Sequence, residues 1–280
     1  MGPLVACNEL LAGDGLDFEG QCRVAAALGY GGLELAPATL GPDPLGVSDA
    51  ALARMARIAA DHGLIIAGLH WLLTPFPDLS ITDPARAAAT QAAMLRLCDI
   101  CAALGGSVMV HGSPRQRVPP PDEATEALLD RVGRLFRPVA EHAGALGLTY
   151  CIEALSPDQT PFLTTLAEAA QLVARVDHPA FVTMIDTSSA GLAEAEAVPD
   201  LIRRWLPTGL IGHVHLNDTN RGAPGMGQDD FHAILAALAD AGWQGPLSIE
   251  PFVIAVNGTA TLAIGAATVR AHLSTLGRTP

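Results

Sequence analysis

Short apolar runs alternate with longer amphipathic stretches along the whole chain. Continuous apolar runs of this length are typical of strands buried on both faces in a parallel sheet. We expect eight such strands, at Leu4–Cys7, Gly32–Leu35, Ile65–His70, Ser107–Val110, Leu148–Ile152, Val182–Ile185, Ile211–Leu216 and Leu247–Ile249. Helical spacing of apolar residues predicts helices over Phe18–Leu28, Asp49–His62, Pro84–Leu104, Asp122–Leu146, Leu166–Val176, Phe231–Ala241 and Ala260–Leu276.

Eight strands in 280 residues give about 35 residues for each strand and its helix, the usual size of a β/α repeat. An open, doubly wound sheet is the alternative fold. Such sheets usually carry a glycine-rich phosphate turn after the first strand, and Ala6–Leu10 contains no glycine. No linker or change of composition divides the chain. The pattern therefore predicts one (β/α)₈ TIM barrel domain over residues 1–280.

Composition narrows the chemistry that this barrel can perform. Half of the residues are hydrophobic and 16% are charged, which permits a large core and excludes global disorder. The formal net charge of −13 opposes binding to nucleic acid phosphates. All 16 basic residues are arginines, so Schiff-base, P-loop and lysine general-base chemistry are excluded. Any catalytic chemistry must therefore use carboxylates, histidines, arginines or a metal ion.

The cysteines and the N-terminus bear on the cellular compartment. Cys98 and Cys101 form a C-x-x-C pair, a spacing also found in redox and zinc sites. They lie in an apolar helical run without a second pair, so we interpret them as buried, reduced thiols. The first residues lack the pattern of a signal peptide, and no apolar run reaches the roughly 18 residues of a membrane span. The sequence predicts a cytoplasmic protein with no membrane partner.

Four consecutive predicted strands end in a residue that can bind a metal: Glu153, Asp186, His215 and Glu250. Their spacings of 33, 29 and 35 residues each match one β/α unit. Because barrel enzymes place their sites at the C-terminal ends of the strands, we expect the four side chains at one rim. Any one of these four residues, considered alone, could instead form an ion pair or cap a helix. Together, three carboxylates would repel one another, and Arg221 alone cannot neutralise them. Three carboxylates and one imidazole suit Mn²⁺, Mg²⁺ or Co²⁺ better than structural zinc.

The segments Cys151–Leu155, Ile185–Thr187, His213–Arg221 and Ile249–Phe252 resemble the ketose 3-epimerase branch of the xylose isomerase-like sugar isomerase and epimerase superfamily. The resemblance implies one bound Mn²⁺, Co²⁺ or Mg²⁺, with Mn²⁺ our first choice and Glu153, Asp186, His215 and Glu250 as its ligands. It also implies that Glu153 and Glu250 are the catalytic residues that move protons. Arg221, six residues after the ligand histidine, matches a substrate-binding arginine of that family.

Two positions depart from the pattern that the resemblance implies. Ser189 stands where the epimerases usually have a histidine, and Gln159 stands where they often have a glutamate. Both positions normally help to hold substrate oxygens, so we keep Ser189 and Gln159 as substrate-binding candidates. The metal-ligand set is unaffected by these changes, whereas the identity of the sugar is left open.

Other polar residues at strand ends are weaker candidates. His70, followed by Trp71, is expected to face the substrate, and Glu34 is expected either to bind a substrate hydroxyl or to pair with an arginine. His111 is as well explained by a structural role as by a role in the site, and so are Asn8 and Glu9. His213 shares a strand face with His215 but lies below the rim, so we exclude it from the ligands. The loop Gly222–Gly227 is interpreted as a lid rather than as a phosphate site.

The leading hypothesis is a metal-dependent ketose 3-epimerase that transfers a proton through a metal-stabilised cis-enediolate. Its substrate would be a small sugar or hydroxy-ketone. The alternatives are an aldose–ketose or hydroxypyruvate-type isomerase, and a catalytically silent sugar- or metal-binding barrel. An endonuclease acting at abasic DNA sites is disfavoured by the negative charge. The resemblance favours a homodimer or homotetramer.

Overall fold

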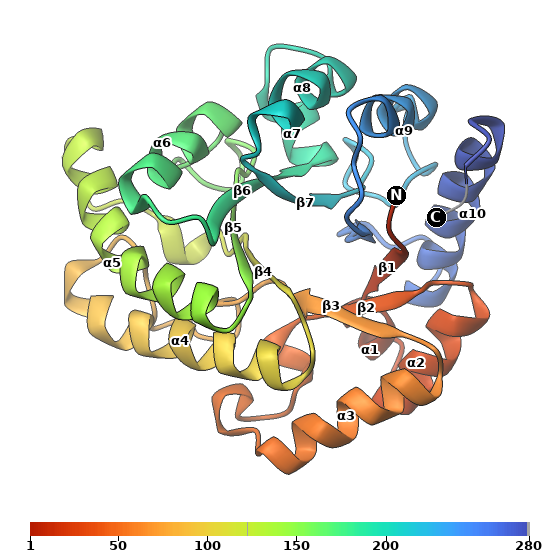
Figure 1. The fold of residues 1–280 in the computed structure, drawn as a ribbon, viewed down its shortest axis with the longest axis horizontal. Coiled ribbons are helices and arrows are strands. Elements are labelled where there is room, and N and C mark those ends of the chain that lie inside the picture. Colours follow the sequence, from red (N-terminus) through yellow and green to blue (C-terminus); the bar gives the residue numbers. More distant parts are fainter. Residues whose placement is uncertain (122, 279–280) are drawn as a thin grey trace.

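In the computed structural model, which describes residues 1–121 and 123–278, eight parallel strands close into a barrel in the order β1 to β8 (Figure 1). Helices surround the barrel, and β1 pairs with β8 to close it. The predicted TIM barrel is therefore confirmed. The strands are β1 (Leu4–Cys7), β2 (Gly32–Leu35), β3 (Ile65–Leu69), β4 (Val108–His111), β5 (Thr149–Glu153), β6 (Phe181–Asp186), β7 (Ile211–His215) and β8 (Leu247–Ile249).

The helices agree with the predicted ranges to within a few residues, apart from the ones noted below. They are α1 (Glu9–Gly13), α2 (Phe18–Ala27), α3 (Asp49–Asp61), α4 (Ala87–Ala103), α5 (Thr125–Ala145), α6 (Leu166–Val176), α7 (Thr187–Ala193), α8 (Val198–Trp205), α9 (Phe231–Asp240) and α10 (Gly258–Thr275). Short 3₁₀ turns are η1 (Pro37–Thr39), η2 (Pro44–Gly46), η3 (Pro84–Arg86), η4 (Arg115–Arg117) and η5 (Leu206–Thr208).

The differences from the predicted helices have local causes. The helix expected over Pro84–Leu104 begins with the 3₁₀ turn η3, because the Asp83 carboxylate accepts a hydrogen bond from the Ala85 amide. The helix expected from Asp122 begins at Thr125, and Asp122 lies outside the described residues. Helices α1, α7 and α8 were not predicted. The first four residues of α7 are all buried, so that helix carries no amphipathic pattern to detect.

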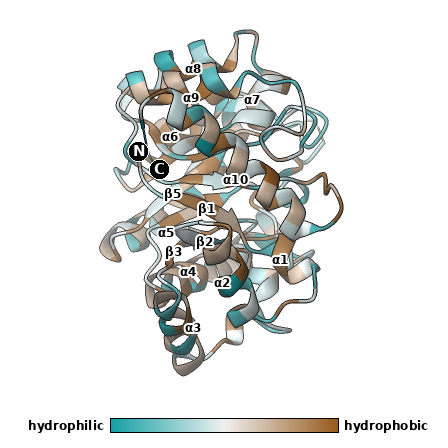
Figure 2. Ribbon diagram, turned by 90° about the vertical axis from the view of Figure 1, so that its right-hand side faces the viewer, coloured by the Kyte–Doolittle hydropathy of each residue, from teal (hydrophilic) through white to brown (hydrophobic). Residues whose placement is uncertain are grey.

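The barrel interior changes from apolar to polar along the strand direction. Val108, Val110, Cys151 and Met184 form an apolar layer inside the barrel. Glu153 and Asp186 follow Cys151 and Met184 by two residues, so they point to the same interior side, closer to the C-terminal rim. The larger apolar core lies between the strands and the surrounding helices. Figure 2 shows this contrast as brown central strands and teal positions on outer helices such as α3 and α8.

The two ends of the described chain meet where the barrel closes. The Asp14 carboxylate, after α1, accepts hydrogen bonds from the amides of Gly258 and Thr259 at the start of α10. The Tyr30 hydroxyl donates to the Leu262 carbonyl. All five cysteines are buried and unpaired, which confirms reduced thiols. Among the described residues, no helix combines the length and apolar character needed to cross a membrane.

Candidate active site

Four side chains from four neighbouring strands converge at the C-terminal rim of the barrel. Glu153 ends β5, Asp186 ends β6, His215 ends β7 and Glu250 follows β8. Each offers one ligand-type atom, and these four atoms all lie within 4.8 Å of one another. The residues are only 3%, 4%, 0% and 1% exposed, respectively. The structure thus brings together the complete set of metal ligands that the sequence predicted.

Negative charge dominates this cluster. Burial and then repulsion by Glu250 raise the pKa of Glu153 well above its usual range. The same two causes raise the pKa of Asp186 to about 6. Burial alone would lower the pKa of His215, but Glu250 and Glu34 raise it well above its ordinary value. Among the described residues, no arginine forms an ion pair with these carboxylates, and the charge of Arg117 lowers the pKa of Glu153 by less than burial and Glu250 raise it.

These residues fit a divalent cation. Three carboxylates and an imidazole are the donor set expected for Mn²⁺, Mg²⁺ or Co²⁺. Glu250 Oε1 is buried and has no hydrogen-bond partner among the described residues. A cation between the four side chains would satisfy that oxygen and offset the mutual repulsion of the three carboxylates.

Asn217 joins two of the candidate ligands. Its side-chain amide donates to Asp186 Oδ2 at 2.6 Å, and its Oδ1 accepts from the Glu250 backbone amide at 3.1 Å. Sequence reasoning gave this residue no role. Its position two residues after His215 is the signal that places it on the same side of the strand end.

The loop after β4 shapes the position of Glu153. A Cβ atom on Gly112 would lie 1.8 Å from Glu153 Oε2, so only glycine leaves room for this carboxylate. The fully buried Arg117 donates to the carbonyls of Glu153 and His111, each at 2.6 Å. The contacts of Gly112 and Arg117 with Glu153 leave no sequence signal, because they join residues 41 and 36 positions apart along the chain.

Below the ligands, Glu34 joins several strands inside the barrel. Its carboxylate accepts hydrogen bonds from His213 Nε2 at 2.8 Å and from His215 Nε2 at 3.0 Å. The Ser248 hydroxyl donates to it at 2.7 Å. The expected alternative of an arginine partner for Glu34 is wrong: its charged partners are histidines.

His70 lies beside the ligand cluster. Its Nε2 donates to Glu9 Oε2 at 2.9 Å and lies 4.0 Å from Glu250 Oε1. The following residue, Trp71, has a φ of +52° and stacks on Phe252 with ring centroids 5.5 Å apart. A cavity of about 470 Å³ adjoins Glu9, Trp71 and Phe252. Trp71 thus lines this cavity, and its ring centroid lies 5.7 Å from that of His70, which borders the ligand cluster.

The remaining substrate-binding candidates lie on the β5, β6 and β7 side of the rim. The Arg221 guanidinium donates to Ser156 Oγ at 3.1 Å and forms an ion pair with Asp158. The Gln159 Oε1 accepts from the Ser156 hydroxyl at 3.0 Å. Ser189 lies in the first turn of α7, where its amide donates to Asp186 Oδ1 at 2.6 Å.

Contacts of the weaker candidates indicate structural roles. His111 Nδ1 and the Tyr150 hydroxyl are 2.8 Å apart in the core. Asn8 is hydrogen-bonded to Gln21, Thr39 and the Ala36 amide.

The carboxylate of Asp218 holds the loop after β7 in its conformation. Asp218 accepts hydrogen bonds from the amides of Gly225, Gly227 and Asp229. A phosphate in this loop would need the same amides, so the structure agrees with the preference against a phosphate site.

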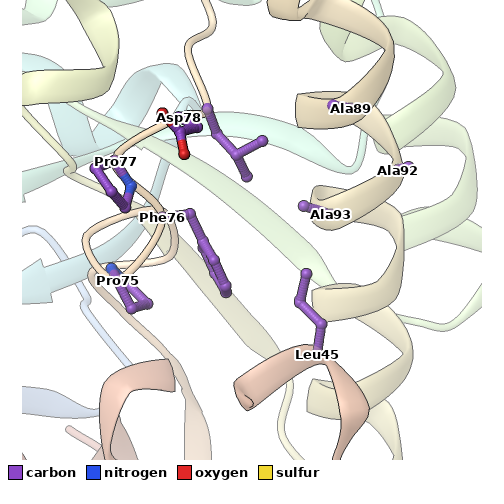
Figure 3. Close-up of a pocket in the computed structure, with 9 residues that line it drawn as sticks. Leu45, Pro75, Phe76, Pro77, Asp78, Ala89, Ala92 and Ala93 are labelled. Carbon is purple, nitrogen blue, oxygen red and sulfur yellow. The ribbon is translucent and has the colours of Figure 1, made fainter. Parts of the chain in front are cut away.

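A larger hollow, of about 550 Å³, lies on the outside of the barrel between η2, the β3–α4 loop and α4 (Figure 3). Its walls are formed by Leu45, Pro75, Phe76 and alanines of α4, with Asp78 at its edge. Among the described residues that line it, Asp78 is the single ionisable side chain. This hollow lacks the groups for catalysis, so the rim cluster remains the candidate active site.

Known proteins are similar to this chain in sequence and in fold. A family model described as xylose isomerase-like TIM barrel matches residues 22–271. A D-psicose 3-epimerase of Agrobacterium fabrum is 33% identical over 212 residues, which cover 74% of this chain and 71% of that protein. A ketose 3-epimerase of Arthrobacter globiformis is 27% identical over 197 residues, covering 69% of this chain and 65% of that protein.

A solved structure of an L-ribulose 3-epimerase shares the fold with a TM-score of 0.83, covering 98% of this chain and 95% of that chain at 22% identity. The family match extends over most of the barrel, including all four strands that carry the candidate ligands. The chain therefore belongs to the xylose isomerase-like TIM barrel family.

Proposed function

We propose that the protein is a metal-dependent sugar epimerase of the isomerase class that inverts C3 of a small ketose. The observation that carries the proposal is the convergence of Glu153, Asp186, His215 and Glu250 at the barrel rim. The relatives named as D-psicose and ketose 3-epimerases support the reaction class. We propose Mn²⁺ as the cation, with Mg²⁺ and Co²⁺ as alternatives, because oxygen-rich sites with one imidazole suit these ions.

Glu153 and Glu250 would act as the proton-transfer pair. One glutamate, as its carboxylate, removes the proton from C3, and the other, which begins as the protonated acid, gives its proton to the opposite face of the resulting enediolate, which inverts the centre. A bound divalent cation supplies a Lewis acid for the oxygens that carry the developing negative charge. Asn217 holds Asp186 and the Glu250 backbone in place, and Arg117 holds the carbonyl of Glu153.

The surrounding residues would hold the sugar. Arg221 lies 3.1 Å from Ser156 and can donate to substrate oxygens from the β7 side of the rim. Gln159 and Ser189 border the same side, whereas His70 approaches Glu250 from the β3 side. We propose that these four residues contact the substrate hydroxyls. We assign Glu34 instead to the layer below, because its carboxylate is already occupied by His213, His215 and Ser248.

Hydrogen exchange from solvent tests this function. The protein is incubated in D₂O with a panel of ketoses and aldoses, with Mn²⁺ or with EDTA, and deuterium is located by NMR. We expect Mn²⁺-dependent label at C3 of a ketose. Label at C1 or C2 would replace the proposal with an aldose–ketose or hydroxypyruvate-type isomerase. Metal binding without label on any sugar would favour a silent binding barrel.

Two variants test the role of the proton-transfer pair. Glu153→Gln and Glu250→Gln keep the side-chain volume but remove the base, so each is expected to lower kcat by at least about 10²-fold. Circular dichroism and the unfolding temperature of the metal-free variants serve as folding controls. Turnover at the wild-type rate in both variants would overturn the mechanism.

We also propose that residues 1–280 form one domain and that the protein is a cytoplasmic homodimer or homotetramer. The pairing of β1 with β8 supports a single domain. Exposed apolar side chains at Phe252, Val253, Ile254 and Val256, between β8 and α10, support association between copies. Sedimentation velocity at several protein concentrations tests the oligomeric state, and a monomer throughout would contradict it.

A further inference from the structure

The carboxylate of Glu34 is placed to control one metal ligand from inside the barrel. Glu34 is 0% exposed and lies on β2, across the barrel interior from β7. Its Oε1 lies 3.0 Å from His215 Nε2, and its Oε2 lies 2.8 Å from His213 Nε2. The Ser248 hydroxyl fills a third acceptor position at 2.7 Å. The carboxylate thus ties β2 to β7 and β8.

The two nitrogens of His215 face different surroundings. Nδ1 points to the ligand cluster, where it lies 2.9 Å from Glu250 Oε2. Nε2 points away from the cluster to Glu34. An ionised carboxylate accepts hydrogen bonds only, so the contact with Glu34 requires a proton on Nε2. In the neutral imidazole, Nδ1 is then left with a free lone pair directed at the cation position.

Among the described residues, no arginine forms an ion pair with Glu34. The ionisable side chains near its carboxylate are the imidazoles of His213, His215 and, at 3.7 Å, His70. No arginine draws the carboxylate away from the imidazoles. The negative charge of Glu34 therefore acts on His215 and increases the electron density that the ring offers to a metal.

We propose that Glu34 is a positioning residue for the metal centre, which fixes His215 in the Nε2-protonated tautomer and holds its Nδ1 toward the cation. The inference rests on the proposed metal-dependent function, since it presumes that His215 is a ligand. Loss of such an outer carboxylate typically weakens metal binding by about 10–100-fold.

Glu34→Gln is the informative variant. Glutamine keeps the volume, but it offers one acceptor oxygen where two imidazole N–H groups and a hydroxyl need acceptors. Ser248→Ala is the matched control, because it removes the hydroxyl that contacts Glu34 and His213 and leaves the contacts of His213 and His215 with Glu34. The metal-free proteins are titrated with Mn²⁺ and Co²⁺ in competition with a chromophoric chelator, well below their unfolding temperatures.

We expect the Mn²⁺ Kd of Glu34→Gln to rise by about 10–100-fold and the Co²⁺ absorption spectrum to change, whereas Ser248→Ala stays within about threefold of wild type. Nitrogen-15 spectra of the Mg²⁺-loaded wild type should show His215 protonated at Nε2. A Glu34→Gln variant with wild-type Kd and Co²⁺ spectrum would overturn the proposal, even if its unfolding temperature fell. A protonated Nδ1 would also overturn it.

These outcomes are separable from failure of the proposed function. If wild-type protein binds Mn²⁺ and Glu34→Gln binds it weakly, the positioning role stands even when no sugar exchanges deuterium. If wild-type protein binds neither Mn²⁺ nor Co²⁺, the metal centre itself is wrong, and the positioning role fails with it.

Discussion

At the scale of single residues, the candidate site places three carboxylates, those of Glu153, Asp186 and Glu250, close to one another. Burial, and then repulsion by Glu250, raise the pKa of Asp186 from 3.8 to about 6 in the metal-free protein. A cation needs the ionised carboxylate, so protons compete with it below that pKa. We expect the Mn²⁺ Kd to fall as the pH rises through 6, where Asp186 loses its proton. Competition titrations at four pH values measure this, and a Kd that is constant from pH 5 to 8 would contradict it.

Gly112 is the residue whose replacement should disturb Glu153 most directly. A Cβ atom at this position would approach Glu153 Oε2 to 1.8 Å, so Gly112→Ala must displace the carboxylate. Misplacement of a catalytic group by about 1 Å can lower the rate by about 10²-fold, and we expect a loss of kcat/KM of that order. Steady-state kinetics with the ketose identified by deuterium exchange measure the effect. Wild-type kcat/KM in Gly112→Ala would show that Glu153 does not need this position.

At the scale of elements, Asp186 performs two tasks at the end of β6. It is a candidate metal ligand, and its Oδ1 also caps α7 by accepting from the Ser189 amide. This double use explains why the chain turns into a helix at the residue that ends the strand. The cap also fixes the direction of the carboxylate, whose other oxygen is held by Asn217.

Two substitutions at this position should separate the tasks. Asparagine is a good helix cap, whereas alanine is a poor one and destabilises by about 1 kcal/mol. We therefore expect metal-free Asp186→Asn to be more stable than metal-free Asp186→Ala by about 1 kcal/mol, while both bind Mn²⁺ weakly. Urea unfolding in EDTA compares the stabilities, and metal titration compares the affinities. Equal stability of the two variants would argue against the capping role.

At the scale of the whole molecule, the four candidate ligands lie at the ends of four consecutive strands, so a bound cation would join half of the barrel. Binding to the native state alone stabilises it, by about 2.7 kcal/mol when free metal is at 100 times Kd. We expect EDTA to lower the unfolding temperature by about 5–10 °C, with recovery on addition of Mn²⁺. Calorimetry with and without the metal measures the shift. An unfolding temperature that does not change with Mn²⁺ would contradict a cation site between these strands.

The sequence by itself determined the barrel and the candidate ligand set. Strands buried on both faces are apolar along their whole length, and the first polar residue after each run marks the rim. This is why Glu153, Asp186, His215 and Glu250 could be identified together, and why the strand boundaries agree with the structure to within one residue. Helix α7 was not predicted, because its first turn is buried and its N-cap, Asp186, is also the residue that ends strand β6.

Only the tertiary structure decided what holds those ligands in place. Glu34 and His215 are in contact although they are 181 positions apart in the sequence. Arg117, in the loop after β4, donates to the carbonyl of Glu153. The ion pair of Arg221 with Asp158 and the stacking of Trp71 on Phe252 are likewise set by the tertiary structure. The periodicity of a strand fixes which side of the sheet a residue faces. Which side chain meets it across a closed barrel depends on how eight strands curve and on their register, and neither is encoded in any single segment of the chain.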